Sequence, residues 1–139
     1  MKSSLLLKTK FTPPPSWGNL PRPHLIQWLD NHNQHRLILI SAPPGYGKTT
    51  LLSDFLSAHS GPAAWYQLEA SDSDPTVFLT YLIESIQRAK SSTKKASKIG
   101  QNAQSLLNSA EAGSSPRRVL TVLINELAEQ SNTPLLIIL

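Results

Sequence analysis

The sequence contains no cysteine, which excludes disulfide bonds, thiolate metal sites and cysteine nucleophiles. It also lacks a long hydrophobic stretch: the longest apolar runs are LILI and LLIIL, far below the ~18 residues that a membrane-spanning helix requires. The N-terminal MKSSLLLKTK has too short an apolar core for a secretory signal. These absences lead us to expect a cytoplasmic protein with no membrane partner.

Charged residues are also few. They make up 16% of the 139 residues, against 40% apolar residues, a balance typical of a globular chain. Thirteen Lys and Arg against nine Asp and Glu leave a net charge of +4. This mild excess suits a polyanion such as a nucleotide, although many proteins without such a ligand are equally basic. The length allows one modest domain with a core of its own.

Prolines, by contrast, are frequent near the N-terminus. Five of them predict an extended strap through residues 1–23 and forbid a helix there: Pro13, Pro14, Pro15, Pro21 and Pro23. A short helix over residues 24–31 is expected next. The brief apolar run at residues 36–40 (RLILI) has the pattern of a strand buried on both faces of a parallel sheet.

The rest of the chain alternates predicted helices and strands. A helix over residues 49–59 precedes a strand over residues 63–68. Asp74-Pro75 and Ser115-Pro116 are N-cap and first-turn pairs that begin two further helices. Their apolar faces comprise Phe78, Tyr81, Leu82, Ile86 and Ala89 in the first helix and Val119, Leu120, Leu123, Ile124 and Leu127 in the second.

Residues 135–139 (LLIIL) form a third predicted strand. Residues 88–115, rich in Ser, Lys, Ala, Asn and Gln, we expect to be a mobile connection with at most one weak helix, through Leu106 and Leu107. Alternating strands and helices of this kind predict an α/β fold, a parallel sheet flanked by helices.

The stretch SAPPGYGKTT directly follows the first predicted strand. It matches the phosphate-loop pattern Gly, four residues, Gly-Lys, Ser or Thr, except that Ala42 replaces the first glycine. Gly45 and Gly47 allow positive φ, so that N–H groups of residues 45–50 form an anion nest at the start of the next helix. Lys48 is expected to reach the β and γ phosphates, and the Thr49 hydroxyl to ligate Mg²⁺.

The complete predicted nucleotide-binding segment is Ala42, Pro43, Pro44, Gly45, Tyr46, Gly47, Lys48, Thr49 and Thr50. An ordinary strand-to-helix turn with a surface lysine is the alternative. The position of the motif, after a buried-strand pattern and before an amphipathic helix, favours the phosphate loop. Residues 1–35 are then an N-terminal strap and short helix, and residues 36–139 a partial P-loop NTPase domain that stops within its Walker B strand.

No catalytic residue is identified. Hydrolysis needs an acidic residue at the end of a neighbouring apolar strand, and the predicted strand 135–139 ends before one. Glu69 and Asp72 follow another strand but lie in a polar loop, where a cap-and-loop role is favoured over a metal role.

The remaining polar and aromatic candidates are interpreted as structural. Solvation is favoured for His24, His32, His35 and His59, and for the basic run Arg88, Lys90, Lys94, Lys95 and Lys98. Packing is favoured over base stacking for Trp17, Trp28 and Trp65.

The runs RLILISAPPGYGKTTLLSDFL and AAWYQLEASDSDPTVFLTYLIESIQ resemble the N-terminal nucleotide-binding region of the MalT-like large ATP-binding LuxR-family transcription regulators. These belong to the signal-transduction (STAND) class of P-loop ATPases. The upstream LLLKTKFTPPP and LPRPHLIQWL also look like that family's lead-in, which places Arg22 near the nucleotide. The likeness covers nearly the whole chain, although residues 90–114 match poorly.

The resemblance implies binding of Mg-ATP or ADP by a nucleotide switch of a transcription regulator. Self-association, DNA binding and completion of the hydrolytic site are expected to depend on further domains of a parent protein. Two alternatives stay open. A P-loop small-molecule kinase would need an arginine-rich lid, for which only Arg117-Arg118 is a paired candidate, and a truncated remnant would have no activity of its own.

Overall fold

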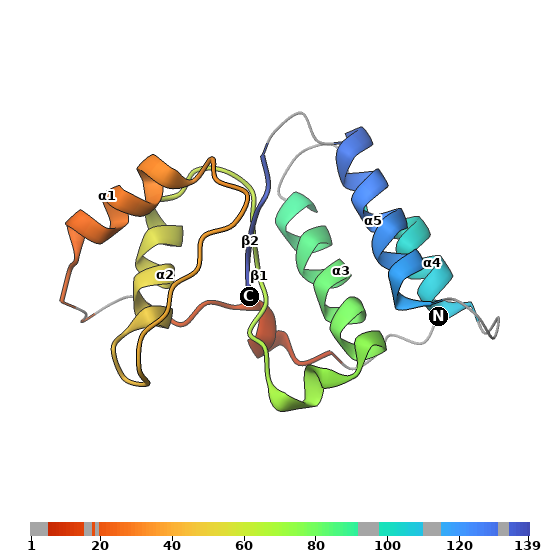
Figure 1. Ribbon diagram of the computed structural model, residues 1–139, viewed down its shortest axis with the longest axis horizontal. Coiled ribbons are helices and arrows are strands. Elements are labelled where there is room, and N and C mark those ends of the chain that lie inside the picture. Colours follow the sequence, from red (N-terminus) through yellow and green to blue (C-terminus); the bar gives the residue numbers. More distant parts are fainter. Residues whose placement is uncertain (1–5, 16–17, 19, 92–97, 110–114, 131–133) are drawn as a thin grey trace. The chain divides into compact units, whose positions relative to one another are not determined.

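The computed structural model describes residues 6–15, 18, 20–91, 98–109, 115–130 and 134–139. The chain forms two compact units, one of Pro13–Ser60 and one of Met1–Thr12 with Gly61–Leu139 (Figure 1). The boundaries of these units differ from the predicted division after residue 35. The division into domains stays a prediction.

The larger unit contains a small parallel sheet. Strand β1 (Ala63–Trp65) pairs with β2 (Leu136–Ile138), with Ala64 opposite Ile137. The pairing continues past β1, because the Tyr66 N–H donates to the Ile138 carbonyl at 2.9 Å. Parallel strands need a long crossover connection, and three helices supply it here. The predicted strands at 63–68 and 135–139 therefore both exist, in shorter form.

Three helices form the crossover between the strands: α3 (Pro75–Ser91), α4 (Gln101–Asn108) and α5 (Pro116–Gln130). Helix α3 packs against β1, while α4 and α5 pack against each other and against α3 (Figure 1). The centre of this core is almost completely buried and comprises Ala64, Tyr66, Ile83, Ile86, Ile99, Ala103, Val119 and Leu123.

The start of α3 is as predicted. The Asp74 carboxylate accepts hydrogen bonds from the N–H groups of Thr76 at 2.7 Å and Val77 at 3.2 Å, which satisfies two donors that the helix itself leaves free. The predicted apolar face of α3 points into the core, with Ile86 fully buried. The stripe predicted on α5 is only half right, since Leu120 and Ile124 are exposed.

The prediction of a mobile connection was wrong over residues 101–108, apart from the weak helix that it allowed through Leu106 and Leu107. This segment is helix α4, and Ala103 on it is fully buried. Of the basic run predicted to be solvated, Lys90 is buried, whereas Arg88 and Lys98 are exposed. Arg88 also pairs with Glu84 at 2.8 Å. Lys94 and Lys95 lie outside the described residues.

The smaller unit is built from α1 (Pro23–His32) and α2 (Lys48–Ala58), which pack against each other. The buried Ser53 of α2 donates its hydroxyl proton to the Pro14 carbonyl at 2.6 Å, which fixes part of the proline segment along the helix.

The strand predicted over residues 36–40 was wrong for the described structure. Residues 37–40 have no strand assignment, and Leu37 and Leu39 are 83% and 84% exposed. An apolar run becomes a strand only where a neighbouring strand satisfies its backbone hydrogen bonds. Among its described residues, Pro13–Ser60 contains no strand with which this run could pair. The fold is thus mainly helical with a two-stranded parallel sheet, compatible with the α/β class.

The N-terminal strap is not extended throughout. Lys8–Phe11 forms a 3₁₀ turn, η1, ahead of the first of the clustered prolines, and a second 3₁₀ turn, η2, spans Ala70–Ser73 after β1. None of the described helices is both long and apolar enough to cross a lipid bilayer.

Candidate functional site

The predicted phosphate loop connects the extended segment 37–40 to α2. Its two glycines both have positive φ, 84° at Gly45 and 73° at Gly47. A side chain at Gly45 would meet no heavy atom within 4 Å, so the glycine is required there by its backbone conformation and not by crowding. Gly47 is also the residue that immediately precedes α2, so the loop turns directly into the helix.

The N-terminus of α2 has the features of an anion site. No side chain caps it, and its first turn contains no acidic residue. The first N–H groups of an α-helix have no acceptor inside the helix, and the helix dipole adds positive potential at this end. Lys48, Thr49 and Thr50 occupy this first turn, with Thr49 exposed. An anion placed before Lys48 would satisfy these donors.

Lys48 folds back over the loop that precedes it. Its ammonium group donates to the Ala42 carbonyl at 2.6 Å and to the Pro43 carbonyl at 3.0 Å. Both acceptors belong to the predicted binding segment, to which Ala42 and Pro43 contribute backbone carbonyl groups and no side-chain donor. The lysine is therefore held at the loop by neutral carbonyl oxygens, which a phosphate oxygen could replace with a stronger charge-assisted bond.

Arg22 approaches the same loop from the start of α1. Its guanidinium donates to the Tyr46 carbonyl at 3.2 Å and to the Gly47 carbonyl at 2.7 Å. The Tyr46 side chain itself is 68% exposed. The structure thus brings together all the residues predicted for the site: the segment from Ala42 to Thr50 and, far from it in sequence, Arg22.

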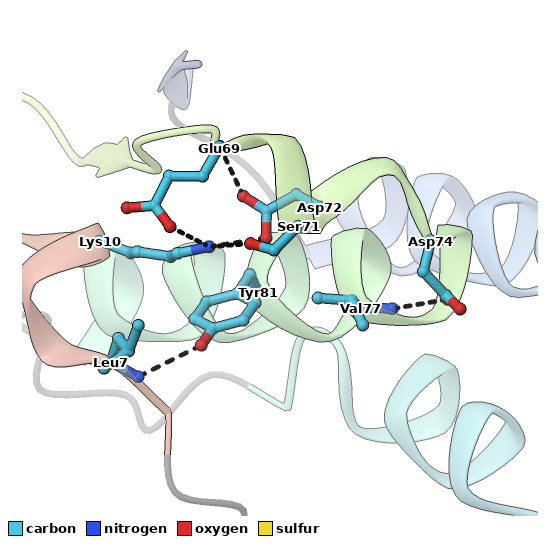
Figure 2. A network of polar contacts seen from close by, with 8 residues as sticks. All are labelled: Leu7, Lys10, Glu69, Ser71, Asp72, Asp74, Val77 and Tyr81. Carbon is cyan, nitrogen blue, oxygen red and sulfur yellow. Dashed lines mark hydrogen bonds and ion pairs between the residues drawn. The ribbon is translucent and has the colours of Figure 1, made fainter.

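A second polar cluster lies in the larger unit, after β1, and was not predicted. Lys10 is buried, and its ammonium group lies 2.7 Å from Asp72 Oδ1 and 3.3 Å from Glu69 Oε2. Figure 2 shows the lysine pointing between the two carboxylates, above the Tyr81 ring. Because an ammonium group already occupies the position between these acids, they are unsuited to hold a metal ion.

The role predicted for these acids, in capping and loop structure, is confirmed. Asp72 Oδ2 accepts the Glu69 N–H at 2.8 Å and closes the turn η2. Burial, the largest single effect on each group, would raise the pKa of Asp72 and lower that of Lys10, but the hydrogen bonds and opposite charges around them together outweigh burial. The pKa of Asp72 therefore lies below its ordinary value, and that of Lys10 above. Burial and then the charge of Asp72 raise the pKa of the neighbouring Tyr66.

The other candidates from the sequence are scattered. His32 lies between Trp28 and His35, with stacked rings at 4.2 and 5.6 Å. Trp65 is buried, as predicted for a packing residue, and Trp28 is 50% exposed with its ring stacked on His32. Trp17 lies outside the described residues. Arg117 and Arg118 are exposed at the start of α5.

Comparison with known proteins identifies the class to which this loop and fold belong. The chain belongs to the family described as Nephrocystin 3, N-terminal, which matches residues 19–139. That range contains Arg22 and the whole predicted phosphate loop. No solved structure matches the chain.

Among curated proteins, the chain is similar to regulators named HTH-type transcriptional regulator MalT. The MalT of Vibrio cholerae is 34% identical over 84 residues, 60% of this chain and 9% of the relative. That of Cronobacter sakazakii is 43% identical over 68 residues, 49% of this chain and 7% of the relative. That of Yersinia enterocolitica is 38% identical over 86 residues, 61% of this chain and 9% of the relative.

These relatives confirm the resemblance to MalT-like regulators that the motifs of the sequence carry. The chain spans less than a tenth of the length of each of the three.

Proposed function

We propose that residues 42–50, with Arg22 bonded to their backbone, bind the phosphates of Mg-ATP or Mg-ADP in the N-terminal part of a nucleotide switch of a transcription regulator. The observation that carries the proposal is the uncapped start of α2, entered through two glycines of positive φ and flanked by the Lys48 ammonium group. The similarity to regulators named MalT supports the choice of a regulator, which would act in the cytoplasm.

The residues present suit a triphosphate chemically. The N–H groups at the start of α2 would hold phosphate oxygens, and Lys48 would exchange its two carbonyl acceptors for the β and γ phosphates. The exposed Thr49 hydroxyl, in the first turn of α2, is suited to ligate Mg²⁺, which neutralises phosphate charge when bound. The choice of ATP over GTP rests on the family resemblance.

A nucleotide can act as a switch only through different affinities for two states of the protein. Lys48 is one residue through which two such states could differ: a state in which its ammonium group stays bonded to the Ala42 and Pro43 carbonyls would bind phosphate less tightly than a state in which it is released to the ligand. In the parent protein, self-association and DNA binding would be the responses to that change, carried out by other domains.

The test is calorimetric titration of residues 1–139 with Mg-ATP and with Mg-ADP. We expect saturable binding that Lys48→Ala weakens by about 10- to 100-fold, because the lysine supplies a charge-assisted hydrogen bond. Lys98→Ala is the matched control, since it removes an exposed lysine in the other compact unit. Equal binding by wild type and Lys48→Ala would refute the assignment of the loop.

The two alternatives predict different results. A kinase would bind ATP as well, and transfer of phosphate from ATP to an added small acceptor, measured in a separate assay, would identify it. A folded wild-type chain that binds neither nucleotide would be the inactive remnant.

A further inference from the structure

Arg22 contacts the loop in a way that the phosphate-loop motif does not account for. The two guanidinium N–H donors bond to the carbonyls of two successive residues, Tyr46 at 3.2 Å and Gly47 at 2.7 Å. The Gly47 carbonyl also accepts the N–H of Leu51 at 2.9 Å. Arg22 therefore bonds to the backbone that leads into α2, and its charge lies beside the loop.

The direction of these carbonyls determines the direction of two N–H groups. In a trans peptide the C=O of one residue and the N–H of the next point in opposite directions, and no described peptide bond is cis. A Tyr46 carbonyl held toward Arg22 turns the Gly47 N–H away from it. The Gly47 carbonyl likewise turns away the N–H of Lys48. Both N–H groups belong to the segment predicted as the anion nest.

We propose that Arg22 is a positioning residue, which fixes two peptide planes of the loop so that the N–H groups of Gly47 and Lys48 face the phosphates. The inference rests on the proposed phosphate-binding function and adds a mechanism to it. Arg22 acts through the backbone, without touching phosphate, sugar or base itself.

The geometry requires arginine at position 22 and glycine at position 47. A planar guanidinium presents donors in a fixed fork that suits two adjacent acceptors, whereas the single ammonium group of lysine does not hold such a pair rigidly. A Cβ on Gly47 would lie 2.9 Å from Arg22 Nη2, so the close approach of the guanidinium needs glycine there. Pro23, the first residue of α1, restricts the backbone of Arg22 and limits where its side chain can begin.

The experiment compares wild type with Arg22→Ala, Arg22→Lys and the control Arg36→Ala, which removes an exposed arginine of the same compact unit. Binding of Mg-ATP, Mg-ADP and Mg-tripolyphosphate is measured by calorimetry. We expect Arg22→Ala to weaken all three by a similar factor of about ten, Arg22→Lys by about three, and Arg36→Ala by none. A similar factor is expected because all three ligands use the same N–H groups.

A second measurement tests the conformation of the loop in the absence of ligand. In ¹H–¹⁵N correlation spectra, Arg22→Ala should shift the amide resonances of Gly47 and Lys48, while Arg36→Ala leaves them in place. Unchanged thermal unfolding of each variant separates this local effect from a general loss of structure. If Arg22→Ala does not fold, Arg22→Lys provides both measurements.

Five results overturn the inference. A loss confined to nucleotides, with tripolyphosphate unaffected, means that Arg22 contacts the base or sugar. A much larger loss for ATP than for ADP means direct contact with the γ phosphate. Unchanged binding, or unchanged Gly47 and Lys48 resonances, removes the positioning role while leaving the phosphate site in place. A wild-type chain that binds none of the three ligands refutes the proposed function, and this inference with it.

Discussion

At the scale of single residues, Lys10 has the role that is hardest to foresee from the sequence. It lies in an apparently unremarkable KTKF segment, more than fifty residues from its partners, yet its ammonium group is buried between Asp72 and Glu69 (Figure 2). The Lys10 carbonyl also accepts the Gln67 N–H at 2.9 Å. The residue therefore fastens the N-terminal turn to the segment after β1 through both its side chain and its backbone.

This pair predicts a dependence of stability on pH. The pKa of Asp72 is lowered in the folded state, so its contribution is present above the unfolded pKa of about 3.9 and is lost as the pH falls below that value. The pKa of Lys10 is raised, so its contribution is lost only as the pH rises above about 10.4. Asp72→Asn should cost about 2 kcal/mol of unfolding free energy at pH 7 and much less at pH 3.

Urea unfolding monitored by circular dichroism at pH 3, 5 and 7 measures this difference. Glu129→Gln, which removes an exposed carboxylate from the same compact unit, is the control. A cost for Asp72→Asn that stays constant from pH 7 to pH 3 would show that the ion pair does not stabilise the fold.

At the scale of elements, helices were predicted where their own ends carry the signal. Asp74 and Pro75 mark the start of α3 within two residues of sequence, and the hydrogen bonds from Thr76 and Val77 confirm it. Helix α4 has no such local signal. Gly100, the residue that precedes the helix, has a left-handed conformation and supplies no side-chain cap. The group that satisfies the N–H donors at this end is the buried carboxylate of Glu126 on α5. A contact across more than twenty residues could not be inferred from composition.

The hydrogen bonds of the Glu126 carboxylate allow its contribution to the unfolding free energy to be predicted. It accepts the N–H groups of Gly100 at 3.1 Å, Asn102 at 3.0 Å and Ala103 at 3.4 Å. Glu126→Ala leaves the buried N–H groups of Gly100 and Ala103 and the part-buried N–H of Asn102 without their acceptor and should cost about 2–3 kcal/mol. Glu126→Gln keeps one oxygen and should cost about half as much. Chemical denaturation measures both, again with Glu129→Gln as control. Equal stability of Glu126→Ala and wild type would mean that water replaces the carboxylate without loss.

At the scale of the whole molecule, the backbone of residues 42–50 follows the prediction from sequence more closely than the sheet does. The loop depends on residues that are close in sequence, Gly45 and Gly47 for backbone conformation and Lys48 for charge, so a motif can predict it. A strand depends on neighbours from elsewhere in the chain. That is why the apolar segment at 36–40 was misinterpreted, while LLIIL, whose partner β1 is present, was predicted correctly.

The division into two compact units predicts which residues nucleotide binding protects from hydrogen exchange. The predicted loop lies within Pro13–Ser60, and a ligand at 100 times its dissociation constant stabilises the state that it binds by about 2.7 kcal/mol. In hydrogen exchange followed by mass spectrometry, Mg-ATP should therefore slow amide exchange in residues 42–58 more than in α3 and α5. Lys48→Ala should reduce this stabilisation to about 0.4–1.4 kcal/mol at the same ATP concentration, because a 10- to 100-fold weaker affinity lowers the occupancy. Equal slowing in α3 and α5 would contradict this expectation, since it requires both units to open as one cooperative structure. Such a result would mean that the effect of the nucleotide extends into α3 and α5, whereas slowing confined to the smaller unit would mean that it stays within residues 13–60.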